Sequence, residues 1–325
     1  MNSGGGRFRL RDLVPFGPAR HPRPRPFLEM AQVLWENRDN LPYAWRILNH
    51  GVCDGCSLGP RGLRDDVIDG IHLCMTRLKL LRLNTMGAAS EDSLRSLARL
   101  RALSNEELRR LGRLPFPMIH REGSDVMHRL SWDEALAIAG EQLRDVPGER
   151  MGFFATSRGI TNETYYAFTK VARLMGSNHV DLCARLCHAA SVAGLKDTLG
   201  VPAPTCSLKD LIGSDLVVIW GSHLAANQPV TMKYLCQARR QGTKILVVNP
   251  MREPALERYW VPSDLRSAIF GTRIMDDFFQ VSVGGDIALM HGVLKHLIEH
   301  EWCDQRFIEE HTQGFDGVKL LMLSL

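Results

Sequence analysis

Two short apolar runs, each ending in a turn signal, form the clearest secondary-structure pattern in this chain. Residues 215–221 read Asp-Leu-Val-Val-Ile-Trp-Gly, and residues 244–250 read Lys-Ile-Leu-Val-Val-Asn-Pro. Runs of this length that are rich in Val and Ile predict buried strands. The stretch between them, from about Pro229 to Arg240, has a helical pattern. We therefore predict one strand–helix–strand unit, in which a right-handed crossover makes the two strands parallel.

The remaining pattern alternates helices with short strands. We predict a helix over residues 27–40, helical segments over residues 90–111 and a short strand over residues 151–155. Ser131 is followed three residues later by Glu134, which is the capping-box signature of a helix start. Because the two element types alternate to the end of the chain, we predict an α/β fold with several domains.

The turns that follow the two predicted strands are candidate ligand-binding positions. Ligands of open parallel sheets lie beyond the carboxyl ends of the strands, which here are Gly221 and the run from Asn249 and Pro250 to Arg252. An ordinary parallel sheet without a ligand at these turns is the alternative. A plain nicotinamide-dependent dehydrogenase is a further alternative, which is weakened because no Gly-x-Gly-x-x-Gly follows Ile219.

A thiol and an imidazole stand side by side at Cys187 and His188. We expect a helix to open here, where unpaired backbone N–H groups and the positive end of the helix dipole stabilise a thiolate. Such a thiolate can bind a metal or attack a substrate, and the neighbouring imidazole can take or give a proton near neutral pH. The alternative is that Cys187 packs as a small apolar residue.

A second candidate metal site lies near the start of the chain. Cys53 and Cys56 are separated by two residues, so that one turn can grip one metal centre, and Cys74 follows. An iron–sulfur cluster is one interpretation, and its fourth ligand is then open among Asp65, Asp66, His72 and a small molecule. A zinc ion held by the three Cys and His72 is the rival interpretation, because that set satisfies tetrahedral zinc.

Composition indicates a globular protein with a basic start. The chain has 325 residues, of which 45% are hydrophobic and 23% charged, and such a chain can bury the cores of about two or three domains. The net charge is only +4, but basic residues crowd the first part among Gly and Pro: Arg7, Arg9, Arg11, Arg20, His21, Arg23 and Arg25. This composition is typical of a flexible, solvated arm, and we expect no nucleic-acid partner.

The chain also lacks the sequence signals of a membrane or exported protein. No apolar run approaches the ~20 residues that span a bilayer, and the start shows neither the apolar core of a signal peptide nor a twin-arginine pattern. We therefore expect a cytoplasmic location and no membrane partner. In that compartment the eight Cys are expected to be reduced thiols rather than disulfides.

The stretch 180–195 around Cys187 resembles the active-site loop of molybdopterin oxidoreductases, specifically the formate dehydrogenase alpha-subunit-like branch. The resemblance implies that Cys187 binds molybdenum and that His188 is a proton acceptor. Residues 154–166 are similar to the Ser-Arg-Gly turn of that family, which lies against the pterin and opens a helix. The cofactor-binding residues implied by this second likeness are Ser157, Arg158, Gly159 and Asn162.

In the same family the turns after the two predicted strands, and a later turn resembling residues 284–289, hold the guanine dinucleotide of the cofactor. The resemblance therefore implies contacts from Gly221, Asn249, Pro250, Arg252, Gly285 and Asp286. Relatives often carry Asn at the position of His223. The resemblance further implies a molybdenum bis-molybdopterin guanine dinucleotide and a [4Fe-4S] cluster on Cys53, Cys56 and Cys74. The usual third cluster Cys is replaced by Pro60.

Taken together, these features predict a basic arm with a first helix over residues 1–40, an iron–sulfur domain over 41–113, a first α/β segment over 114–180 and a Rossmann-like cofactor domain over 181–325. Complete members of the family are longer, and the apolar finish at residues 317–325 is expected of a fragment. We predict two-electron oxidoreductase chemistry on formate or a small oxyanion, with an electron-transfer protein or accessory subunit as a partner. A non-catalytic scaffold bearing zinc or an iron–sulfur cluster remains the alternative.

Overall fold

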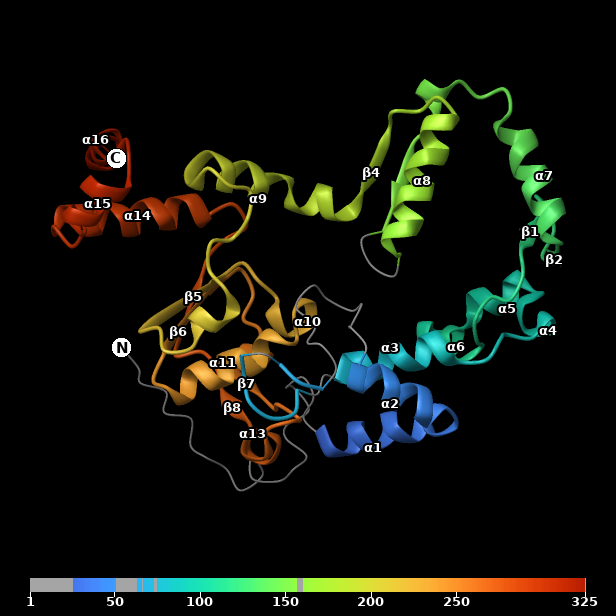
Figure 1. The fold of residues 1–325 in the computed structure, drawn as a ribbon, viewed down its shortest axis with the longest axis horizontal. Helices are drawn as coiled ribbons and strands as arrows, with labels where there is room; N and C mark the ends of the chain where they lie inside the picture. The colour runs from blue at the N-terminus through green and yellow to red at the C-terminus, as the bar shows by residue number, and fades with distance from the viewer. Residues whose placement is uncertain (1–25, 51–62, 66, 73–74, 157–159, 325) are drawn as a thin grey trace.

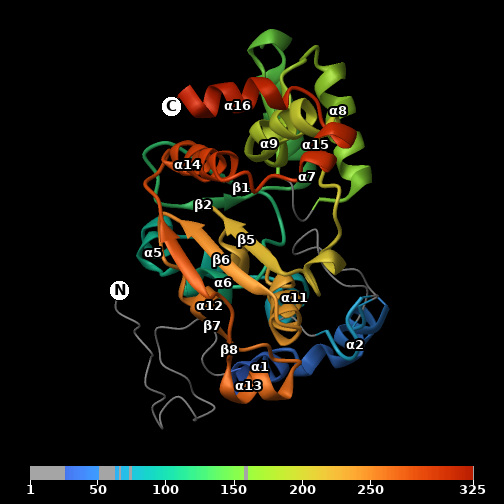
Figure 2. The same ribbon diagram turned by 90° about the vertical axis from the view of Figure 1, so that its left-hand side faces the viewer.

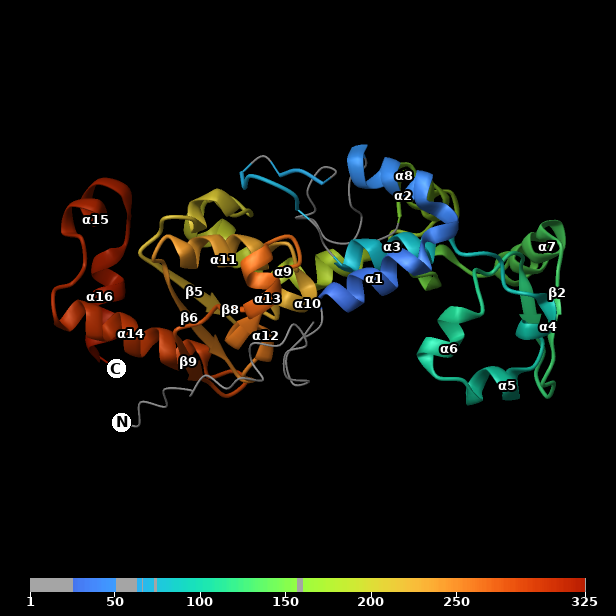
Figure 3. The ribbon, with the colours of Figure 1, turned by 90° about the horizontal axis from the view of Figure 1, so that it is seen from below.

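The structure is a computed structural model that describes residues 26–50, 63–65, 67–72, 75–156 and 160–324. The described chain is a mixed α/β protein, as the sequence predicts, and it contains both parallel and antiparallel strand pairs. Figures 1 and 3 show an elongated arrangement. Helices from the first half of the chain lie toward one end, the last three helices lie at the other end, and a parallel sheet lies between them.

The first described helices pack on one another around a small apolar core. They are α1 (Pro26–Glu36), the 3-10 helix η2 (Arg38–Asn40), α2 (Leu41–His50) and α3 (Met75–Thr85). Val33, Ala44 and Leu81 form that core. Arg82 of α3 donates to both carboxylate oxygens of Asp39, at 2.8 and 2.9 Å. The helix predicted over residues 27–40 is thus confirmed, with a break into 3-10 geometry at its end.

Capping residues then divide the next stretch into short helices. They are α4 (Glu91–Leu94), α5 (Leu97–Ala102), α6 (Asn105–Arg110) and α7 (Trp132–Leu143). An antiparallel hairpin of β1 (Met118–His120) and β2 (Met127–Arg129) precedes α7. The predicted capping box at the start of α7 is present, because Ser131 accepts from the Glu134 amide while Glu134 accepts from the Ser131 amide at 2.7 Å.

The next part of the chain forms a small pair of parallel strands with its connecting and flanking helices. It consists of β3 (Phe153–Ala155) and β4 (Val180–Leu182), which pair in the register Phe153 to Val180. The 3-10 helix η3 (Gly148–Arg150) precedes β3, α8 (Asn162–Leu174) connects the two strands, and α9 (Cys183–Leu199) follows β4 directly. The short strand predicted at residues 151–155 is therefore confirmed.

The main sheet has three parallel strands in the order β5-β6-β9. These are β5 (Leu216–Trp220), β6 (Lys244–Asn249) and β9 (Asp277–Gln280). The connection from β5 to β6 runs through α10 (Leu224–Asn227) and α11 (Thr231–Arg240), so the predicted strand–helix–strand unit is confirmed. Figure 2 shows the strands pointing to one side of the molecule, toward α14.

The remaining elements around this sheet are short. They are η4 (Leu208–Leu211), α12 (Pro254–Glu257), α13 (Leu265–Phe270) and the antiparallel pair β7 (Arg258–Tyr259) and β8 (Thr272–Arg273). The largest core is formed by this unit, and Met232, Leu235, Ile245 and Val247 in it are at most 1% exposed. Each such side chain contributes about 1.5–3 kcal/mol when fully buried, so this part is the stable centre of the fold.

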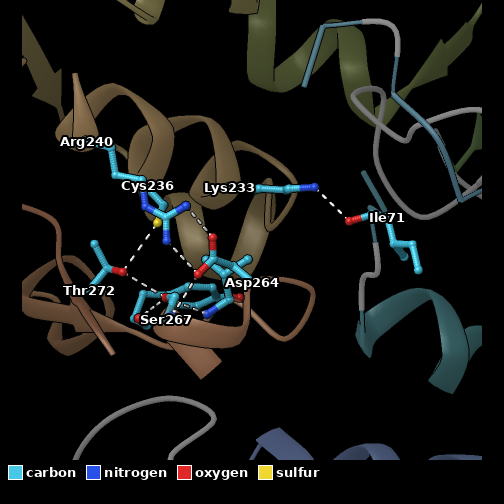
Figure 4. Close-up of polar contacts among 9 residues, drawn as sticks. Ile71, Lys233, Cys236, Arg240, Asp264, Ser267 and Thr272 are labelled. Atoms are coloured by element: carbon cyan, nitrogen blue, oxygen red, sulfur yellow. Dashed lines mark hydrogen bonds and ion pairs between the residues drawn. The ribbon is translucent and has the colours of Figure 1, made fainter. Parts of the chain in front are cut away.

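Polar contacts hold α11 against α13 and β8 (Figure 4). Arg240 of α11 forms an ion pair with Asp264, which also accepts the Ser267 amide at 2.8 Å at the start of α13. Thr272 donates to the Ser267 hydroxyl at 2.8 Å and lies 3.3 Å from the Cys236 thiol. These contacts fix the orientation of α11 relative to α13 and β8.

Three helices complete the described chain: α14 (Asp286–Glu299), α15 (Gln305–His311) and α16 (Phe315–Ser324). Helices α14 and α16 pack against one another. In the part of the chain that the structure describes, none of the helices combines the length and apolar character needed to cross a bilayer.

Candidate cofactor-binding site

The turns after β5, β6 and β9 meet at one edge of the main sheet, because all three strands run in the same direction. Gly221 ends β5 with a φ of 63°, a left-handed conformation that favours Gly, and its amide donates to the Val248 carbonyl at 2.9 Å. A Cβ added to Gly221 would meet nothing within 4 Å. This turn therefore leaves open space beside the backbone.

The turn before α14 is tied to the end of β5. The indole N–H of Trp220 donates to Asp286 Oδ1 at 2.7 Å. Gly284 adopts a φ of 85°, and the Gly285 amide donates to the Ser282 carbonyl at 2.8 Å. One carboxylate oxygen of Asp286 is thus engaged within the protein, and the α14 N-terminus is held beside β5.

The turn after β6 is tied to β9. Gln280 donates from its side-chain amide to the Pro250 carbonyl at 3.0 Å. Arg252 contacts Glu257 Oε1 at 2.5 Å and lies over the Phe278 ring at 5.4 Å. Among the described residues, the Asn249 side chain has no hydrogen-bond partner. An amide with a free donor and acceptor at this edge can bind the hydroxyls or the base of a nucleotide.

His223 and Glu253 join the turn after β5 to the turn after β6. His223 Nε2 lies 3.2 Å from Glu253 Oε1, and Glu253 is 2% exposed. Within the described residues, neither Glu253 oxygen has a hydrogen-bond partner of normal geometry. Burial raises the pKa of Glu253, and the lowering effects of His223 and the Ala225 amide do not cancel it. His223 therefore contacts a buried carboxyl group.

Cys187 and His188 lie in α9 and are both exposed. The helix begins at Cys183 rather than at Cys187. Cys187 consequently lies in the second turn, where the unpaired amides of the first turn do not reach it. Its thiol instead contacts the Ala184 carbonyl, with the sulfur 3.7 Å from the oxygen. The exposed thiol remains accessible to a metal.

The segment before Cys74 docks on α11. Asp65 accepts from the Tyr234 hydroxyl at 2.6 Å and lies 3.1 Å from His72 Nδ1, while His72 is 3% exposed. The Asp65 carboxylate also accepts the Val67 and Ile68 amides, at 2.7 and 3.1 Å. Burial raises the pKa of Asp65, but its hydrogen bonds lower it further, so the net shift is downward. Both oxygens are committed to the protein, which disfavours Asp65 as a cluster ligand.

Lys233 adds a contact between the same segment and α11, because its ammonium group donates to the Ile71 carbonyl at 2.7 Å (Figure 4). Seven of the predicted site residues and candidate ligands lie outside the described residues: Cys53, Cys56, Asp66, Cys74, Ser157, Arg158 and Gly159. Asn162 is the first residue of α8, whose cap is Thr161. Across the described ranges, no group of three or more His, Cys, Asp or Glu side chains could hold a metal.

Two contacts at this edge were not predicted from the sequence. Glu253 carries no motif, although its position directly after the run ending in Arg252 is a weak signal. The partnership of Trp220 with Asp286 joins residues far apart in the chain and has no local pattern. Both contacts depend on which turns the sheet brings together.

The fold and the three turns define an α/β protein with its candidate ligand edge at the carboxyl ends of parallel strands. The family profile described as "Molybdopterin oxidoreductase" matches residues 113–304, which is more than half of the 325 residues. The chain therefore belongs to the molybdopterin oxidoreductase family.

Curated relatives support this assignment. The chain is 33% identical over 231 residues to an uncharacterized oxidoreductase of Mycobacterium tuberculosis, covering 69% of this chain and 30% of the relative. It is 32% identical over 216 residues to the F420-dependent formate dehydrogenase 1 subunit alpha of Methanococcus maripaludis (66% and 29% covered). It is 33% identical over 216 residues to formate dehydrogenase H of Escherichia coli (65% and 28% covered). The matched region thus spans less than a third of each relative's length.

Proposed function

We propose that this chain forms the cofactor-holding part of a formate dehydrogenase-like oxidoreductase that uses a molybdenum bis-molybdopterin guanine dinucleotide. The observation that carries the proposal is the meeting of Gly221, Asn249 and Asp286 at one edge of the β5-β6-β9 sheet. They come from three separate segments of the chain, and the sequence resemblance to the family implies that they contact the guanine dinucleotide. The open space beside Gly221 and the unpaired amide of Asn249 fit such a ligand.

The residues of the edge bind and orient rather than react. Asn249 would contact the nucleotide through its amide, while Gly221 lets the ligand approach the backbone closely. The amides at the start of α14 would face its phosphates, because a helix N-terminus favours anions. The contacts of Trp220 with Asp286 and of His223 with Glu253 hold these turns in place before the cofactor binds. A preorganised edge lowers the ordering cost of binding.

Cys187 and His188 would serve the molybdenum end. When bound, the molybdenum centre accepts or supplies two electrons. Cys187 would hold it through its thiolate, and His188, next in sequence and exposed like Cys187, would accept or release the proton that accompanies the transfer. Formate, or another small oxyanion, is the proposed substrate class.

The segment at the start of the chain would carry the electrons onward. Cys53, Cys56 and Cys74 are proposed to hold a [4Fe-4S] cluster in a small N-terminal domain. The docking of residues 63–65 and 67–72 on α11 supports a fixed position of that domain beside the cofactor unit, through Asp65, His72, Tyr234 and Lys233. An electron-transfer protein or accessory subunit is the proposed acceptor, and we propose a cytoplasmic location.

Metal analysis of the anaerobically purified full gene product tests the proposal. We expect molybdenum and iron together and formate-dependent reduction of a dye. Cys187→Ala should abolish turnover and lower molybdenum while iron stays unchanged, whereas Cys206→Ala, which alters another exposed thiol, should behave as the parent. Stoichiometric zinc without iron or molybdenum would support the non-catalytic scaffold instead.

A further inference from the structure

Two histidines lie against one another at the end of α14, far along the chain from the proposed cofactor edge residues Gly221 and Asn249. His296 is in the last turn of the helix, His300 is its C-cap, and their ring centroids are 4.0 Å apart. Both side chains are exposed. The spacing of four residues places them on the same face of the helix. Two imidazoles in this arrangement can donate to one metal ion.

The hydrogen bonding of His300 leaves its Nε2 atom available to bind a metal. His300 Nδ1 lies 2.9 Å from the His296 backbone carbonyl oxygen. A carbonyl oxygen only accepts, so Nδ1 carries the proton and Nε2 keeps its lone pair. Metal-binding histidines commonly donate their second ring nitrogen to a carbonyl in this way, which fixes both the tautomer and the ring orientation.

The backbone after α14 is bent back to bring an aromatic ring onto this pair. Glu301 has a φ of 56° and is the one residue other than Gly with a positive φ among those the structure describes. Its amide donates to the Ile298 carbonyl at 3.2 Å, and the Trp302 amide donates to the Leu297 carbonyl at 2.9 Å. This is a Schellman motif, in which Gly or Asn usually occupies the left-handed position.

The strained turn places Trp302 beside both imidazoles. Its ring centroid lies 5.5 Å from that of His296, in an edge-on arrangement, and 5.0 Å from that of His300. The left-handed region is sterically unfavourable for a residue that carries a Cβ. Trp302, itself 65% exposed, thus lies in ring contact with both imidazoles.

The local charges also favour a cation. The C-terminal end of a helix carries a partial negative charge. Glu299 and Glu301 add carboxylates, and Lys295, the residue before His296, contacts Glu299 with 3.9 Å between nitrogen and oxygen. Imidazole ligands select late first-row transition metals over Mg²⁺ or Ca²⁺.

We propose that His296 and His300 bind one divalent ion of the class Zn²⁺, Ni²⁺ or Cu²⁺, with water completing the coordination shell. Trp302 forms the wall of this site and reports on its occupancy, because a paramagnetic ion at the histidines quenches the adjacent indole. The site is independent of the proposed cofactor chemistry, since it uses no residue of the β5-β6-β9 edge.

The test titrates chelator-treated protein with Ni²⁺ and follows tryptophan fluorescence. The parent protein should show saturable quenching that Zn²⁺ reverses by competition. Trp302→Phe should lose this quenching but retain Zn²⁺ binding in calorimetry. Since the chain has six Trp, the difference between parent and Trp302→Phe isolates the signal of Trp302.

His296→Gln and His300→Gln should each abolish the saturable quenching, while far-ultraviolet circular dichroism remains that of the parent. His291→Gln is the matched control, because it removes an imidazole from the same helix outside the pair and should leave the quenching unchanged. Absence of quenching in the parent, or equal quenching in the parent and His300→Gln, would overturn the proposal. An equal loss of the saturable quenching in His291→Gln would also overturn the proposal.

Discussion

Trp220 and Asp286 are 66 residues apart in sequence, yet the indole N–H of Trp220 donates to Asp286 Oδ1 at 2.7 Å. The contact joins the last residue of β5 to the first residue of α14. It therefore fixes the turn after β9 relative to the turn after β5. Because both turns belong to the proposed cofactor edge, the contact links the stability of the sheet to the shape of the site.

Replacing Trp220 with Phe tests that link. Trp220→Phe keeps a large aromatic ring but removes the donor to Asp286, and we expect a loss of about 1–2 kcal/mol in the free energy of unfolding. Urea denaturation followed by circular dichroism measures the loss. Trp132→Phe is the control, since Trp132 is 68% exposed. Equal unfolding free energies for the two variants would show that the hydrogen bond contributes nothing.

The predictable part of the fold is the part with a local pattern. Strands β5 and β6 begin and end within about one residue of the predicted runs, because the apolar residues of each strand are contiguous in sequence. Strand β9 reads Asp-Phe-Phe-Gln, which has no distinctive pattern. It becomes a strand through pairing with β6, in the register Leu246 to Asp277, and that pairing is a tertiary event.

The first residue of α9 could not be predicted from the sequence. The helix was expected to open at Cys187 but begins at Cys183, because Leu182 precedes it without a side-chain cap and nothing in the sequence marks the start.

For the candidate site, the turns at Gly221 and Asn249 were predictable from the strands they follow. The pairing of His223 with Glu253 was not, since it depends on two turns meeting across the sheet.

Glu253 is expected to make stability depend on pH. Its pKa is raised, so the folded protein holds that proton more tightly than the unfolded chain. The resulting stabilisation is complete below the ordinary pKa of Glu and is lost as pH rises through the raised pKa. Glu253→Gln removes the titrating carboxyl group, so the variant does not lose this stabilisation as pH rises. The unfolding free energy of the variant minus that of the parent should therefore increase as pH rises.

Urea midpoints of the parent and Glu253→Gln between about pH 4 and 8 measure this difference. Glu309→Gln, which changes an exposed carboxyl, serves as the control. A difference between Glu253→Gln and the parent that stays constant with pH would mean that Glu253 titrates alike in the folded and unfolded chains.

Asp276 is expected to show the opposite dependence. Burial raises the pKa of Asp276, but hydrogen bonds from the Ile245 amide and from Arg239 lower it further, so the net shift is downward. Its carboxylate accepts from these two groups at 2.8 and 2.5 Å. A lowered carboxyl pKa contributes stability above the ordinary pKa of Asp, and the contribution is lost as pH falls through the lowered value.

Asp276→Asn should therefore destabilise the protein by about 1 kcal/mol near neutral pH, and by progressively less in acid. Asp277→Asn is the matched control, because the neighbouring Asp277 is exposed. Thermal unfolding across the acid range gives the comparison. A penalty for Asp276→Asn that is unchanged at the lowest pH would contradict the assigned shift.

The last prediction concerns His188, which is exposed next to Cys187 in α9. We expect it to exchange a proton beside the metal rather than to bind the metal. Gln has a similar volume and can form hydrogen bonds but cannot carry the proton. His188→Gln in the full gene product should therefore lower turnover, while molybdenum and iron contents stay at the parent level. His128→Gln, which removes an exposed imidazole from β2, should leave turnover unchanged. If His188→Gln turned over as the parent does at every pH, His188 would be a structural residue, and the proton acceptor would have to come from another part of the protein.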